Sequence, residues 1–312
     1  MILTLLDVVL PVFLVIGAGY AATRSGYFKS SAVDGLMVFT QGLAIPCLLF
    51  KATMSLDLST ALNTGLLASF YVGATISFAL GILGARWIFD RRPGESVAVG
   101  FGAFFSNSVL LGLAITERAY GTTALEFNYA IIAFHAPFCY GVGITVMEIA
   151  RSDGASFART SRKVLAAMFK NPLMLGIIAG FVANLAAITI PDAVDTALDM
   201  MIRAALPAAI FGLGGVLVRY RIRDKLDQVA MIAVLSLIVH PAITWGLATH
   251  VFDLGPAMLR SAVITAAMAP GVNAYLFSTM YGRATGVMSS AVLLCTILSI
   301  FTASFWLSLL PA

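Results

Sequence analysis

The stretch "MAPGVNAYLF", residues 268–277, decides the fold, because it places helix-breaking residues inside an apolar segment long enough to cross a membrane. Pro270 and Gly271 stand side by side, and the uncharged amide Asn273 follows them. Proline and glycine interrupt helices, and an amide is costly in hydrocarbon. Interrupted backbone persists at membrane depth only where it is buried in protein or faces a wet cavity. The stretch therefore predicts a broken membrane helix.

Composition places the whole chain in a membrane. Of its 312 residues, 60% are hydrophobic and 11% are charged, whereas soluble domains average roughly a quarter charged residues. The mean hydropathy of +0.96 and apolar runs of about 20 residues predict an all-α polytopic membrane protein. The net charge of +4 is not gathered on one tail or face, which argues against nucleic-acid binding. Cys47, Cys139 and Cys295 lie in apolar segments and are interpreted as core residues, without a metal.

Ten spans are predicted, and positive charge orients them. Most Lys and Arg residues fall in the odd-numbered loops, while Lys51, Arg118 and Arg260 fall in even-numbered ones. Since Lys and Arg stay on the cytoplasmic side, both termini are expected to be extracytoplasmic, in the inner (cytoplasmic) membrane. The predicted spans are 4–23, 33–53, 62–88, 97–116, 127–149, 168–189, 194–217, 229–251, 259–281 and 285–309.

An internal repeat appears when the sequence is compared with itself at an offset of 161 residues. "IPCLLF" (45–50) then meets "LPAAIF" (206–211), which pairs Pro46 with Pro207, and Tyr120 meets Tyr281. The halves 1–150 and 151–312 would each hold five spans, and an odd number turns the second copy upside down in the membrane. Inverted repeats are typical of secondary transporters.

The same offset sets "SNSVLLG" (106–112) against the stretch at 268–273. Broken helices at corresponding positions are the best sequence pointer to a transporter's binding site. Ser106, Asn107 and Ser108 are suitable N-caps for a half-helix starting near Val109, and Pro270 suits a first helical turn. Two helix N-termini would favour an anion, while the opposing C-terminal ends could hold a cation. The alternative is structural: Pro and Gly are common in membrane helices, and Asn holds helices together.

Several further side chains are candidates. Arg203 lies within the seventh span, where it either binds a substrate carboxylate or pairs with Asp199, four residues earlier. Gln41 either faces the substrate or joins helices. His135 and His240 are candidates for proton coupling, but a neutral imidazole bonded to the carbonyl freed by the next proline is favoured. Pro46, Pro207 and Gly112 are candidate hinge or crossover residues.

Taken together, these segments resemble the auxin efflux carrier family, especially its bacterial malonate and organic-acid branch. The resemblance covers the whole chain and is carried by "PVFLVIGAGYAATRSGYF", "LAIPCLLFKATMS", "SNSVLLGLAITERAYG", "NPLMLGIIAGF", "ALPAAIFGLGGVL" and "MAPGVNAYLFSTMYG". One departure is that the break in the fourth span has no proline.

The family implies ten helices in two inverted five-helix repeats, with discontinuous helices 4 and 9 crossing, as in sodium/proton antiporters and bile-acid symporters. It further implies a scaffold from helices 1, 2, 6 and 7, dimerisation through helices 2 and 7, and an elevator-like transport domain from helices 3–5 and 8–10. Asn107 and the region of Pro270 and Gly271 would then hold the substrate carboxylate.

The function expected from these observations is secondary transport of a small organic anion such as malonate, with proton or sodium coupling open and no other cofactor. Alternatives are export of auxin-like indole acids, a sodium-coupled symporter and a sensor built on a carrier fold. An intramembrane enzyme is not expected, because the chain has neither an HExxH zinc pair nor a Gly-x-Ser-Gly nucleophile.

Overall fold

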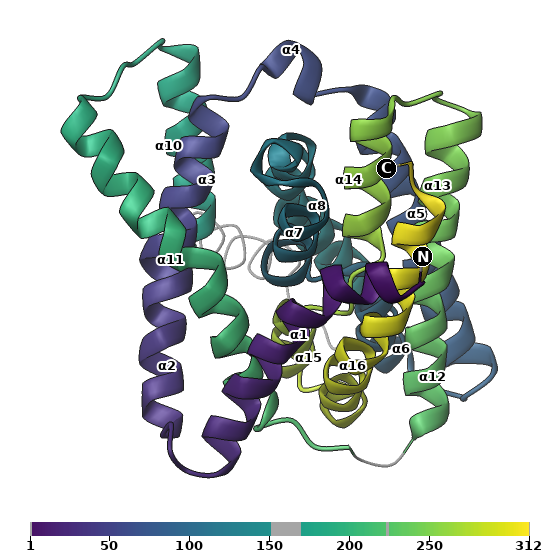
Figure 1. Ribbon diagram of the computed structural model, residues 1–312. Helices are drawn as coiled ribbons and strands as arrows, with labels where there is room; N and C mark the ends of the chain where they lie inside the picture. Colours follow the sequence, from purple (N-terminus) through teal and green to yellow (C-terminus); the bar gives the residue numbers. More distant parts are fainter. Residues whose placement is uncertain (1, 151–169, 223–224, 312) are drawn as a thin grey trace. The chain divides into compact units, whose positions relative to one another are not determined.

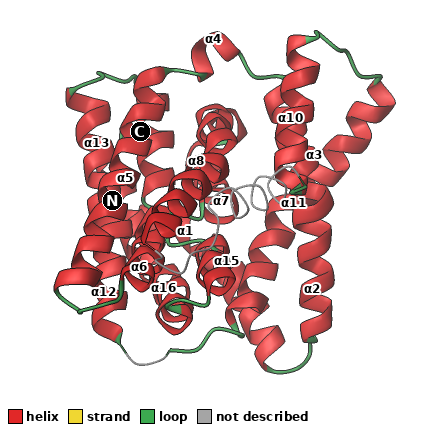
Figure 2. Cartoon of the chain, turned by 180° about the vertical axis from the view of Figure 1, so that it is seen from behind, coloured by secondary structure: helices red, strands yellow, loops and turns green. Residues whose placement is uncertain are grey.

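The computed structural model describes residues 2–150, 170–222 and 225–311, and this part of the chain is helical throughout, with no β-strand (Figure 2). Seven of its helical stretches are long and apolar enough to cross a membrane, and Pro172–Leu185 is a shorter apolar helix. The all-α, polytopic membrane class predicted from composition is therefore confirmed.

The chain forms two compact units. Helix α1 contributes its first residues to unit 1 and, from Pro11 onward, belongs to unit 2. Unit 1 otherwise contains α5 (Thr64–Trp87), α6 (Pro93–Phe104), η2 (Ser108–Gly112), α7 (Leu113–Tyr120), η3 (Thr122–Leu125), α8 (Glu126–Ala150), α12 (Leu226–Val234), η4 (Leu235–Val239), α13 (His240–His250), α14 (Pro256–Ala266), α15 (Val272–Tyr281) and α16 (Thr285–Leu309). Unit 2 contains α2 (Ser30–Phe39), η1 (Thr40–Ala44), α3 (Ile45–Met54), α4 (Leu58–Ala61), α10 (Pro172–Leu185) and α11 (Asp192–Leu217), while α1 itself spans Ile2–Arg24.

Unit 2 depends on close helix contacts made by glycines. Helices α2 and α3 run as one rod through the π-helical turn η1, with α11 beside them (Figure 1). A Cβ added at Gly214 of α11 would collide with the backbone carbonyl of Ile16 in α1, and one at Gly180 of α10 would collide with Thr53 of α3. Small residues that let helix backbones approach are the usual interface in membranes, where apolar burial drives little association.

Polar contacts fix one end of the same unit. Asn184 of α10 donates from Nδ2 to the carbonyls of Met54 and Leu56 at 2.7 and 2.8 Å, and so satisfies backbone groups beyond the end of α3. Lys51 lies 2.7 Å from both Asp195 and Asp199 of α11. Since all three side chains are partly exposed, the ion pairs are expected to orient the helices more than to stabilise them.

In unit 1, prolines interrupt helical bonding and side chains repair it. The π-helical turn η4 precedes Pro241, which has no N–H to give to the carbonyl of Leu237. Trp306 of α16 donates its indole N–H to that carbonyl at 2.8 Å.

Both α7 and α15 end at a glycine with positive φ, Gly121 at 84° and Gly282 at 62°, which suits a residue without a Cβ.

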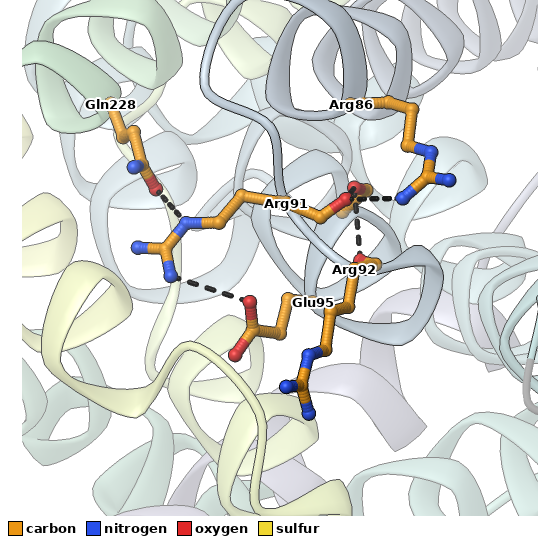
Figure 3. A network of polar contacts seen from close by, with 6 residues as sticks. Arg86, Arg91, Arg92, Glu95 and Gln228 are labelled. Atoms are coloured by element: carbon orange, nitrogen blue, oxygen red, sulfur yellow. Dashed lines mark hydrogen bonds and ion pairs between the residues drawn. The ribbon is translucent and has the colours of Figure 1, made fainter.

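A network of arginines joins the α5–α6 loop to α12 (Figure 3). The Arg91 guanidinium donates to Gln228 Oε1 at 3.0 Å and pairs with Glu95 Oε2 at 3.3 Å, with 13% of its side chain exposed. Arg86 donates to the Arg91 carbonyl at 2.8 Å, so the loop is held at both backbone and side chain. The Arg92 side chain points away from these partners in the same view.

Gly214→Ala should destabilise the protein, because its methyl group would enter the space of the Ile16 carbonyl. Overpacking of this kind costs about 1–3 kcal/mol. Gly17→Ala is the matched control, since a Cβ at Gly17 has no neighbour within 4 Å, and alanine favours the helix. The thermal unfolding midpoints of the two variants in detergent measure the difference. Equal midpoints would contradict the proposed close packing.

Arg91→Leu should also lower the unfolding midpoint, because it leaves the nearly buried Gln228 amide oxygen without its donor. An unsatisfied buried acceptor costs about 1–3 kcal/mol. Arg92→Leu removes the same charge from an exposed side chain of the same loop, and should leave the midpoint close to that of the wild type. A similar loss in both variants would assign the effect to charge and not to the network.

Candidate functional site

Two helices of unit 1 are interrupted where the sequence predicted it. Helix α6 ends at Phe104, and the chain resumes its helical path at Ser108, in the π-helical turn η2 that leads into α7. Helix α14 ends at Ala266, and α15 begins at Val272. The expected start near Val109 is thus correct to within one residue.

The two interruptions meet in a short antiparallel bridge between Ser106 and Pro270. The N–H of Asn107 donates to the carbonyl of Ala269 at 2.8 Å, and the N–H of Gly271 donates to the carbonyl of Phe105 at 3.1 Å. We call residues 105–107 and 269–271 the crossover. The bridge satisfies part of the backbone that the breaks release, as burial requires.

Proline occupies a different position from the one predicted. The sequence suggested that Pro270 starts the second half-helix, but Gly271 is the N-cap of α15 and Val272 is its first residue. Pro270 therefore lies just outside the helix, in the bridge. Its missing N–H is harmless there, because the bridge bonds are made by the residues on either side of it. Gly271 lies against Asn107, since a Cβ there would be in ordinary van der Waals contact with the Asn107 Cα, at 3.4 Å.

Asn107 caps the first half-helix and retains a free donor. Its Oδ1 accepts the N–H of Leu110 at 3.3 Å, and its carbonyl accepts the N–H groups of Leu111 and Gly112 at 3.2 and 3.0 Å. Within the described residues, its Nδ2 donates to no partner. The side chain is only 7% exposed, so this amide is a buried donor at the crossover.

The serines and the second asparagine complete the polar surface. The Ser106 hydroxyl is buried and has no hydrogen-bond partner among residues 2–150, 170–222 and 225–311. Ser108 is buried at the start of η2. Asn273 is half-buried in the first turn of α15, and its carbonyl accepts the Tyr140 hydroxyl at 3.4 Å. The buried Gly112, which closes η2, lies beside Met268.

Both histidines contact backbone carbonyls, but not those predicted. His135 Nε2 lies 3.2 Å from the carbonyl of Ser106, and His240 Nε2 lies 3.2 Å from the carbonyl of Phe70. From the sequence, each ring was expected to bind the carbonyl freed by the next proline. The carbonyl freed by Pro241, that of Leu237, accepts the indole N–H of Trp306. Each histidine ring instead contacts a carbonyl of another segment. Their part in proton coupling stays a prediction.

Unit 2 contains the remaining predicted site residues. Gln41 lies half-buried in η1, Pro46 lies at the start of α3, and Pro207 is exposed within α11. Arg203 is exposed on α11, and it forms no ion pair within the described part of the chain. The predicted alternative, neutralisation by Asp199, is wrong because Asp199 pairs with Lys51. Contact between these residues and the substrate stays a prediction.

One buried polar cluster was missed from sequence. Asn128 of α8 is fully buried and donates from Nδ2 to the hydroxyls of Thr116 in α7 and Thr265 in α14, at 3.2 and 2.8 Å. It thereby links α8 to one half-helix from each interruption. The available signal was an amide near the start of an otherwise apolar span, but the spacing of the two threonines gives no hint of their meeting.

The crossover has the chemistry of an anion site without a metal. The first N–H groups of a helix have no intrahelical partner, and the helix dipole adds partial positive charge there. Two helical segments, η2 and α15, begin on either side of the bridge. No cluster of His, Cys, Asp or Glu side chains in the described residues is arranged to hold a metal ion.

Known proteins are similar to this chain over nearly all of its length. A "Putative malonate transporter" of Rhizobium meliloti is 23% identical over 300 residues, which cover 95% of this chain and 92% of that protein. A "Lysosomal cholesterol signaling protein" of Mus musculus is 24% identical over 331 residues, 98% of this chain but only 38% of that protein. The membrane transport protein family matches residues 4–307, so the chain belongs to this family, that of the auxin efflux carriers.

Proposed function

We propose that the protein is a secondary transporter of small organic anions, malonate or similar carboxylates, bound at the crossover. The observation that carries the proposal is a buried bridge with two unused side-chain donors on its first segment, the Asn107 amide and the Ser106 hydroxyl. Such groups can hydrogen-bond a carboxylate without supplying a charge. The similarity to a protein named as a malonate transporter supports the choice of substrate class.

The proposed plan has ten membrane passes in two inverted repeats. Its support is that helices recur at the sequence offset of 161: α5 matches the stretch from α12 to α13, and α7 matches α15. Both members of the second pair end at a tyrosine followed by a glycine with positive φ. Counting the two interrupted helices and the short α10 as passes would add three to the seven long apolar stretches.

The proposed mechanism is elevator-like alternating access in an inner-membrane homodimer, with both termini extracytoplasmic. Unit 1 would carry the substrate, because it contains the whole crossover. Unit 2 would be the scaffold, and it would dimerise through the second and seventh membrane passes of the chain. The division of the chain into two compact units supports separate motion. Positive charge in the odd-numbered loops supports the orientation.

A second candidate is a sensor that kept a carrier fold. The mouse relative, named as a signaling protein, favours it, although the chain spans only 38% of that relative. Uptake of radiolabelled malonate into proteoliposomes separates the two, because a sensor would bind without accumulation. Uptake driven by a sodium or a proton gradient in parallel samples identifies the coupling ion, and competition with indole acids tests the auxin-like alternative.

Asn107→Asp should raise the KM for malonate by about ten- to hundred-fold. The carboxylate still accepts the Leu110 N–H, so the cap is retained, but the Nδ2 donor is lost and a negative charge faces the anion. A hydrogen bond to a charged group contributes about 1.5–3 kcal/mol. Asn63→Asp is the matched control, since Asn63 caps α5 through the Leu66 N–H at 3.0 Å. An unchanged KM in the Asn107 variant would overturn the site assignment.

Arg203→Gln should remove the preference for dicarboxylates, if the guanidinium holds a second carboxylate. We expect malonate to raise the thermal midpoint of the wild type more than acetate does, and the variant to respond equally to both. Arg118→Gln removes an exposed charge from α7 and serves as the control. A preference for malonate that survives in Arg203→Gln would exclude Arg203 from the site.

A further inference from the structure

We propose that α8 covers the Ser106 carbonyl of the crossover with the imidazole of His135, and that His135 is the positioning residue that makes the site favour an anion over a cation. The inference rests on the proposed function and deepens it. Nothing in the similarity to known transporters assigns this role to α8.

The Ser106 carbonyl is released by the bridge itself. The two bridge bonds use the backbone of Phe105, Asn107, Ala269 and Gly271, so Ser106 and Pro270 form the pair without mutual hydrogen bonds. The Ser106 carbonyl instead accepts the Ser108 N–H at 2.9 Å and lies 3.2 Å from His135 Nε2. A carbonyl carries no proton, so Nε2 is the donor, and this fixes the tautomer of the ring.

Two more side chains of α8 act on the same backbone. Cys139 Sγ lies 3.9 Å from the carbonyl of Phe104, the last residue of α6, and the Tyr140 hydroxyl donates to the carbonyl of Asn273 at 3.4 Å. Carbonyls at a helix end have no intrahelical partner. Of these three carbonyls only that of Ser106 belongs to the crossover, since Phe104 ends α6 and Asn273 lies in the first turn of α15, so His135 is the α8 side chain that acts on the crossover itself.

The consequence concerns the charge of the ligand that the site favours. A helix break releases N–H groups, which attract an anion, and C=O groups, which repel it. Once His135 covers the Ser106 carbonyl, the unused groups at the crossover are donors: the Asn107 amide, the Ser106 hydroxyl and the first N–H groups of α15. His135 is 2% exposed and packs against the rings of Phe70 and Phe105, so its hydrogen bond is strengthened by low-dielectric surroundings.

The molecule provides its own control in His240. Its Nε2 makes the same contact, 3.2 Å to the carbonyl of Phe70, and the residue is 1% exposed. Both histidine rings pack on Phe70. The two sites therefore match in burial, distance and acceptor, but only His135 acts on the crossover. Loss of a buried histidine as such should affect both alike, and loss of the proposed role should affect His135 alone.

The test compares malonate uptake and thermal midpoint for the wild type, His135→Phe, His135→Gln and His240→Phe in proteoliposomes. His135→Phe should raise KM about ten-fold, which corresponds to one hydrogen bond of about 1.4 kcal/mol. His135→Gln should stay within about three-fold of the wild type, because the glutamine amide nitrogen reaches the place of Nε2. His240→Phe should lower the midpoint and leave unchanged the KM for malonate exchange measured without a proton gradient, a condition that removes any contribution of His240 to proton coupling.

Where His135→Phe does not fold, His135→Asn replaces it, since its shorter amide does not reach the Ser106 carbonyl and should raise KM as well. An unchanged KM in both variants, or an equal rise in His240→Phe, would overturn the inference. Asn107→Asp in the same assay distinguishes a failure of the role proposed for α8 from a failure of the proposed binding site. If it raises KM and His135→Phe does not, only the role of α8 fails. If neither changes KM, the proposed site fails.

Discussion

Two main-chain hydrogen bonds, from Asn107 to Ala269 and from Gly271 to Phe105, hold together the part of the structure on which the proposed function depends. Hydrocarbon offers no partner for a broken helix, so each interruption would be unstable alone. Each satisfies part of the other. The tether explains why Pro270 occupies a bridge position that has no hydrogen bond to make. It also explains why the surrounding helices carry polar side chains that face inward.

The buried polar groups of unit 1 form one consistent system around this tether. Asn128 links α7 and α14 through two threonine hydroxyls, and His135 binds a crossover carbonyl from α8. These groups are buried among apolar side chains, where an unpaired polar atom is costly. The Ser106 hydroxyl is one of several buried side-chain atoms in the described residues that lack a hydrogen-bond partner, and it lies in the crossover itself.

Sequence alone could predict the helical class and the positions of both interruptions. Composition is a global property, and Pro270, Gly271 and the Ser106–Ser108 caps act through neighbouring backbone, so local rules suffice. Pairings between distant residues were less accessible. Asp199 is four residues from Arg203, yet it pairs with Lys51, 148 residues away, because α3 packs beside α11. The partners of the histidines could not be predicted for the same reason. The carbonyl of Leu237, freed by Pro241, accepts the indole N–H of Trp306, which is distant in the sequence.

The bridge between the two interruptions has a further consequence for how such proteins diverge, because main-chain atoms alone form it. Peptide N–H and C=O groups are the same whatever side chain they carry, so the bridge can survive replacement of most residues around it. An identity of only 23% over nearly the whole chain is therefore compatible with the same pairing of interrupted helices.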